Sequence, residues 1–130
     1  MASDPLVEPI EGGEHDEFAG IRIDLFEAGD ARVKRLVYGV GGKWSEHVKP
    51  HVGTEWCEHA HVGFLARGRL AGEYPDGCAF DFTAPTGVHI DPGHDSWVVG
   101  DEPAVLIEFD FGPNTVDRLG VPDSHQHAGP

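Results

Sequence analysis

"VGFLARGRLAGEYPDGCAFDFT", residues 62–83, contains three short strand-forming segments separated by two turn signals. The first two segments meet at Gly68, a residue type that commonly interrupts a strand. The second and third are separated by Pro75, Asp76 and Gly77, and an Asp-Gly pair between apolar segments is typical of a hairpin turn. The stretch therefore predicts three consecutive strands in the middle of the chain.

Short strand-like runs also occur on both sides of this stretch. Ile21, Ile23 and Leu25 alternate with charged residues, as in a half-buried strand, and a Gly-Asp turn follows at residues 29–30. Further runs of this kind are RVKRLVYGV (32–40), GVHI (87–90), SWVV (96–99) and AVLIEFDF (104–111). Only NTVDRLG, residues 114–120, has the pattern of a short helix, with Asn114 as a cap and Gly120 as its end. About nine short strands with almost no helix predict an all-β sandwich or barrel.

Composition narrows the range of partners. The chain has 130 residues, and 23 acidic side chains against 9 basic ones give a net charge of −14. Such a surface repels phosphate backbones and anionic lipid, so we expect neither a nucleic-acid nor a membrane partner. No apolar run approaches the roughly 18 residues that span a bilayer. The first 17 residues lack the basic and apolar regions of a signal peptide, so we expect a cytoplasmic protein in which Cys57 and Cys78 are free thiols.

The chain is long enough for one domain with a single core. Residues 1–17 are acidic and rich in Pro and Gly, which predicts an N-terminal arm or edge strand. Residues 18–120 carry the strand pattern and are expected to form the barrel domain. Residues 121–130 are polar and are expected to be a flexible tail.

The order of strands and glycines resembles the cupin superfamily, whose first motif has the form G-x5-H-x-H-x(3,4)-E-x6-G. Read from its start, the motif places Gly41 before His47, but its second ligand position falls on Lys49. Read backwards from Gly68, it places His61 where the family usually has glutamate. Seven or eight extra residues therefore interrupt the motif, and His59 lies outside its regular positions.

The second cupin motif resembles GVHIDPGHDSWVVGDEP, residues 87–103. Asp91, Pro92 and Gly93 match its tight turn, whereas the usual ligand position falls on Ser96. The histidine present is His94, two positions earlier and therefore on the same face of a strand. The resemblance covers roughly residues 20–111 and extends to small bacterial cupins of uncharacterised function. It implies a jelly-roll β-barrel with at most a short C-terminal helix.

Histidine spacing predicts a metal site. His59 and His61, at positions i and i+2 of a strand, project to the same side and are close enough to share one ion. His47 and His94 could complete the set from neighbouring strands, which would suit one divalent transition metal such as Zn, Fe, Ni, Mn or Cu. Cys57 could join only if the chain bends after it. Other candidate members of the site are Glu55 and Lys49. The alternative is that His59 faces solvent and His61 is a hydrogen-bonded interior histidine.

Aromatic residues supply candidates for the wall of a small-molecule pocket, namely Trp44, Trp97, Phe64 and Phe109. The resemblance implies a metal-dependent enzyme of the dioxygenase, isomerase or lyase type, and a homodimer, but it identifies no catalytic residue. The alternative is a non-catalytic barrel that binds or senses a small molecule at a degenerate metal site. Lys49 favours this alternative, because an ammonium group at a ligand position would oppose a cation or bind an anionic ligand.

Overall fold

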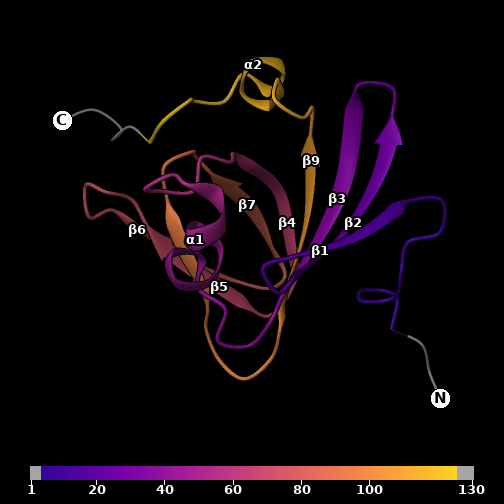
Figure 1. The fold of residues 1–130 in the computed structure, drawn as a ribbon, viewed down its shortest axis with the longest axis horizontal. Coiled ribbons are helices and arrows are strands. Elements are labelled where there is room, and N and C mark those ends of the chain that lie inside the picture. Colours follow the sequence, from indigo (N-terminus) through magenta and orange to yellow (C-terminus); the bar gives the residue numbers. More distant parts are fainter. Residues whose placement is uncertain (1–3, 126–130) are drawn as a thin grey trace.

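The computed structural model describes residues 4–125. Within that range the chain forms nine strands and three short helical segments (Figure 1). The strands are β1 (Glu14–Phe18), β2 (Ile21–Ala28), β3 (Ala31–Tyr38), β4 (His61–Arg67), β5 (Arg69–Glu73), β6 (Ala79–Thr83), β7 (Thr86–Ile90), β8 (Asp95–Val98) and β9 (Ala104–Asp110). The helical segments are η1 (Trp44–Val48), α1 (Lys49–Val52) and α2 (Thr115–Leu119).

The strands form two antiparallel sheets, which confirms the all-β jelly-roll prediction. The larger sheet has the order β1-β2-β3-β9-β4-β7, and the smaller has the order β6-β5-β8. Figure 1 shows the smaller sheet facing part of the larger one, while β1, β2 and β3 extend to one side. No helix in the described range is long and apolar enough to cross a membrane.

Residues 62–83 form the predicted succession of strands. Gly68 separates β4 from β5 with a φ of 84°, which a glycine adopts without strain. It also has no room for a side chain, because an added Cβ would lie 2.5 Å from the carbonyl oxygen of Pro103. The β5–β6 hairpin closes through a hydrogen bond from the Tyr74 amide to the Cys78 carbonyl, with Gly77 at a φ of 90°.

The prediction of helix only near the C-terminus is wrong for residues 44–52. These residues form η1 and α1, a continuous helical segment between β3 and β4. Pro50 lies in the first turn of α1, where proline needs no hydrogen-bonded amide, and Gly53 ends the helix in the left-handed conformation. The segment between Gly42 and Gly53 has no strand-like alternation. Its own sequence therefore favours a helical turn, which the alignment with the cupin motif did not reveal. Helix α2 confirms the predicted C-terminal helix, and Gly120 ends it.

The core lies between the two sheets and is centred on Leu65 and Leu106, both completely buried. Beside it, the same interior face carries His61 and Glu108, which are buried polar residues. The N-terminal segment lies on the outer face, where Asp4 pairs with Arg67, and β1 is an edge strand of the larger sheet. Much of the predicted tail, residues 126–130, lies outside the described residues.

Candidate metal centre

Three buried side chains of metal-ligating type meet inside the barrel. Cys57 precedes β4, His61 is the first residue of β4, and His94 immediately precedes β8. One donor atom from each lies within 4.8 Å of the other two. His94 is 1% exposed, and the other two are less than 10% exposed.

Backbone pairing brings Cys57 to this group. The Cys57 amide donates to the His94 carbonyl at 2.8 Å, and the Gly93 amide donates to the Cys57 carbonyl at 2.7 Å. This bridge holds Cys57 beside His94, and β4 begins only at His61, so Cys57 does not lie in one extended strand with His61 and can join the group. The turn residue Gly93 has a φ of 91° and allows the second half of the bridge to form.

Both imidazoles are fixed through their Nδ1 atoms. His94 Nδ1 donates to the Asp91 carbonyl at 2.7 Å, and His61 Nδ1 lies 2.5 Å from Oε2 of Glu108. A carbonyl and a carboxylate can only accept, so Nδ1 carries the proton in both rings. The Nε2 atoms are therefore the groups left for coordination, and acceptors placed in this way commonly orient metal-binding histidines.

Gly63 allows Glu108 to lie close to His61. Strands β4 and β9 pair with Gly63 opposite Glu108, two residues along β4 from His61. A Cβ at Gly63 would lie 2.0 Å from the Ile107 carbonyl oxygen and 2.6 Å from the Glu108 Cα. Any larger residue would push the two strands apart, so this glycine sets the separation between the carboxylate and the imidazole.

Burial and neighbouring groups shift the pKa values of Cys57, His61 and Glu108. Burial raises the pKa of the Cys57 thiol, but hydrogen bonds and positive charge from His61 and His94 lower it to about 5. Burial lowers the pKa of His61, yet the Glu108 carboxylate and Cys57 raise it to about 10. Burial likewise opposes ionisation of Glu108, and His61 with Lys34 holds the pKa of that carboxyl below its ordinary value. The thiolate, which is the metal-binding form of cysteine, is therefore favoured at neutral pH.

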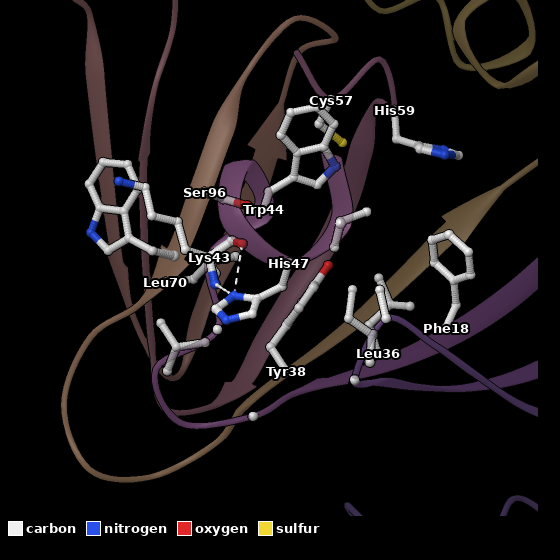
Figure 2. Close-up of a pocket in the computed structure, with 18 of the residues that line it drawn as sticks. Phe18, Leu36, Tyr38, Lys43, Trp44, His47, Cys57, His59, Leu70 and Ser96 are labelled. Carbon is white, nitrogen blue, oxygen red and sulfur yellow. Dashed lines mark hydrogen bonds between the residues drawn. The ribbon is translucent and has the colours of Figure 1, made fainter. Parts of the chain in front are cut away.

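Cys57 and His61 line part of a pocket of about 460 Å³. Figure 2 shows Cys57 among the residues around this pocket. Its wall is mostly apolar, and its polar side chains include Lys34, His59 and Glu108. The apolar lining includes Phe18, Ile21, Leu36, Tyr38, Val40, Trp44, Val48, Leu70 and Trp97. Of the predicted wall residues, Trp44 and Trp97 line this pocket. Phe64 and Phe109 do not: they lie on the outer side of the larger sheet and are 41% and 46% exposed, so that part of the prediction is wrong.

His47 is not brought to the three buried donors. It belongs to η1, and its Nδ1 accepts a hydrogen bond from the Lys43 amide at 3.1 Å. Figure 2 shows its ring turned toward Lys43, at the part of the pocket away from Cys57. The prediction of His47 as a ligand assumed a strand, whereas the helical turn points the side chain elsewhere.

The other candidate ligands also lie apart from the three donors. The His59 ring centroid is 6.3 Å from that of His61, but the side chain is exposed and points away from Cys57 (Figure 2). Lys49 is the first residue of α1 and pairs with Glu55 at 3.2 Å on the surface. Lys49 is thus removed from the ligand position that the motif assigned to it.

Sequence reasoning missed Glu108 and Lys34. Both lie in runs that read as continuous strands, and the register places them opposite each other on the face toward the pocket. Lys34 Nζ lies 3.6 Å from Oε1 of Glu108 and 3.4 Å from Oδ2 of Asp110. The alternation of side chains in the segment AVLIEFDF (104–111) was the signal that could have found Glu108. Leu106, Glu108 and Asp110 lie on the same face of strand β9, so two acidic residues follow a core leucine on the interior face.

No protein-family model matches the sequence, and no curated protein matches it. Solved structures do resemble the fold. A Cupin 2 conserved barrel domain protein from Salinispora arenicola is 19% identical with a TM-score of 0.54, over 92% of this chain and 98% of that one. A cupin-2 domain protein from Rhodospirillum rubrum is 16% identical with a TM-score of 0.54, over 78% and 71%. KdgF from Halomonas sp. is 14% identical with a TM-score of 0.50, over 74% and 84%.

Proposed function

The chain is a small cupin-type barrel, and we propose that it is a metal-dependent enzyme acting on a small organic molecule. In this proposal Cys57, His61 and His94 hold one divalent transition metal. The observation that carries it is the orientation of the two imidazoles, whose Nδ1 atoms are both engaged by acceptors. Because the pKa of His61 is raised to about 10, its Nε2 carries a proton in the metal-free chain; a metal that bound here would displace this proton and take the Nε2 atoms of both rings, beside the Cys57 thiolate.

The donor set fits a transition metal better than Mg or Ca. One sulfur and two nitrogen donors suit Zn, Fe, Ni or Cu, whereas the harder ions prefer oxygen ligands. Three protein ligands leave a coordination position for a substrate, as in catalytic sites. A metal bound here supplies Lewis-acid chemistry toward an oxygen donor of the substrate.

The pocket residues support a substrate with an apolar body and an oxygen-bearing head. Trp44, Tyr38 and Leu36 would pack on the body and exclude water. Lys34 would attract an anionic head, and its own charge is balanced by Glu108 and Asp110. Glu108 holds the His61 ring in place through Nδ1. These features fit a dioxygenase, isomerase or lyase, and fold alone does not choose among them.

Metal analysis of untagged protein tests the proposal. We expect close to one bound transition metal in this barrel site, strongly reduced by His94→Ala and by Cys57→Ala. His47→Ala is the matched control, because His47 is a histidine of the same pocket that lies outside the three donors. Metal content that is unaffected by His94→Ala and Cys57→Ala would refute the proposed site. It would favour the alternative, a barrel that binds a small molecule without catalysis.

We also propose a homodimer formed through the outer face of the larger sheet. Phe26 and Phe109 both pair with Val33 on neighbouring strands, and Phe64 pairs with Ile107, so these residues share that face. The three phenylalanines are between 41% and 46% exposed, and burying them would favour association. Analytical ultracentrifugation should give a dimer for the wild type and a monomer for Phe109→Glu. A monomeric wild type at micromolar concentration would exclude the dimer.

A reducing, cytoplasmic setting fits the two cysteines. Cys57 and Cys78 do not form a disulfide, and a thiolate ligand is easily oxidised outside such a compartment. Cell fractionation would check this, and recovery of the protein from an oxidising compartment would contradict it.

A further inference from the structure

A second group of metal-ligating side chains lies outside the barrel pocket. Asp76 belongs to the β5–β6 turn, Cys78 ends that turn, and His125 comes from the chain after α2. Figure 1 shows the chain after α2 running over the end of the barrel, toward the side where β6 lies. One donor atom from each of the three residues lies within 4.8 Å of the other two.

The hairpin turn fixes the first two donors. The Cys78 amide donates to Oδ1 of Asp76 at 2.9 Å, and the Gly77 amide donates to the Tyr74 carbonyl at 3.0 Å. Asp76 therefore has one oxygen engaged in the turn, while its Oδ2 lies 3.7 Å from Nε2 of His125. An Asp-x-Cys step across a tight turn thus presents an oxygen and a sulfur donor to the same place.

The His125 ring is held on two sides. It stacks on Tyr74 with ring centroids 3.8 Å apart and an interplanar angle of 8°. Its Nδ1 lies 3.7 Å from Oδ2 of Asp91, a buried carboxylate, and its Nε2 is directed toward Asp76. In a metal-binding histidine, one ring nitrogen usually faces a carboxylate while the other ring nitrogen binds the metal.

We propose that Asp76, Cys78 and His125 form a second site, which binds a divalent cation of the zinc type. One nitrogen, one sulfur and one oxygen donor suit Zn²⁺, and a water or another ligand would complete the coordination. The carboxylates of Asp76 and Asp91 add negative charge that attracts a cation. Because the donors come from the hairpin and from the C-terminal segment, the ion would fasten that segment to the barrel.

This site is distinct from the buried one. The Tyr74 ring contacts both sites: its centroid is 6.4 Å from that of His94 and 3.8 Å from that of His125. The Cys57 group is buried, whereas Asp76 is exposed and Cys78 and His125 are half-buried. An ion in the second site is therefore expected to exchange faster with a chelator than one bound inside the barrel.

Cobalt titration of the untagged Cys57→Ser chain tests the second site by itself. Cys78 is then the only thiol, because the chain has two cysteines. We expect a thiolate-to-cobalt absorption band that saturates at one Co²⁺ per chain and is lost in His125→Ala. His89→Ala is the matched control, since His89 also pairs with Asp91, at 2.8 Å, but is not a donor in this group. The background variant lacks the buried thiol ligand, so the result does not depend on the proposed enzyme site.

Alkylation of Cys78 in the wild-type chain gives a second measurement that avoids the Cys57→Ser background. We expect Zn²⁺ to slow modification of Cys78 at least tenfold, and His125→Ala to remove this protection. Absence of the cobalt band, its persistence in His125→Ala, or equal alkylation rates with and without Zn²⁺ would each overturn the proposal.

Discussion

Replacing Glu108 by Gln isolates the effect of its charge on the proposed metal centre. Glu108 is 2% exposed, and its Oε2 accepts the hydrogen bond from His61 Nδ1. Glutamine has nearly the same shape and retains an amide oxygen that can accept this bond. The substitution therefore keeps the ring orientation while removing the negative charge that makes His61 a stronger donor to a metal.

The size of the effect follows from the kind of hydrogen bond that is lost. Hydrogen bonds to charged groups contribute about 1.5–3 kcal/mol, and neutral ones about 0.5–1.5 kcal/mol. The difference, about 1–1.5 kcal/mol, corresponds to a roughly 5- to 12-fold weaker metal affinity. This overlaps the roughly 10- to 100-fold loss usual when such supporting groups are removed. In the variant, Lys34 still has a carboxylate partner, because its Nζ lies 3.4 Å from Oδ2 of Asp110.

Competition with a chromogenic chelator would measure the metal affinity of metal-stripped, refilled protein. Thermal unfolding of the metal-free chains would show whether the variant is folded. Glu55→Gln is the control, an identical substitution at an exposed residue that pairs with Lys49 on the surface. Equal affinities for wild type and Glu108→Gln, with both chains folded, would refute the role assigned to this carboxylate.

Two further predictions concern stability. Gly63→Ala should lower the free energy of unfolding by about 2–3 kcal/mol, because the Cβ of the new alanine would overlap the β9 backbone. Gly87→Ala is the control and should change stability little, because a Cβ at Gly87 would meet open space. Urea unfolding of the two variants would measure the difference. Burial raises the pKa of Asp110, but its bonds to Arg32 and other donors hold the net pKa below the ordinary 3.8. A lowered carboxyl pKa stabilises the fold above pH 3.8, and this contribution is lost as pH falls further. Asp110→Asn should therefore lower the free energy of unfolding by about 2 kcal/mol at pH 7 and by less toward pH 3. Asp81→Asn is the control, because Asp81 is exposed, and it should leave the acid unfolding curve nearly unchanged. An equal loss of stability in Asp110→Asn at both pH values would contradict this prediction.

The positions of the strands in the sequence could be predicted because their signals are local. The turn at Asp76-Gly77, the break at Gly68 and the alternation around Ile23 each depend on a few neighbouring residues. Backbone preferences and side-chain parity act over that range, and the strands lie where these signals predict them. Helix α2 was predictable for the same reason, since Gly120 ends it.

The site was predicted only in part. His61 and His94 were named as candidate ligands and Cys57 as a conditional one, and all three lie in the buried group, although His94 precedes β8 and strand parity does not apply to it. His47 was misplaced because the motif was extended through residues that fold into a helical turn. His59 is two residues from His61, but β4 begins only at His61, so the i and i+2 rule does not apply to this pair.

By itself the sequence determined the strand pattern, the hairpin turns and the residue types from which a metal site could be made. Tertiary structure alone decided which of these residues meet. The backbone bridge to His94 brings Cys57 to the group, and the β4–β9 register places Glu108 beside His61 across 47 residues of chain. The physical reason is that local conformational preferences fix the direction of each side chain within its own element. Which elements become neighbours depends on sheet pairing and core packing over the whole barrel.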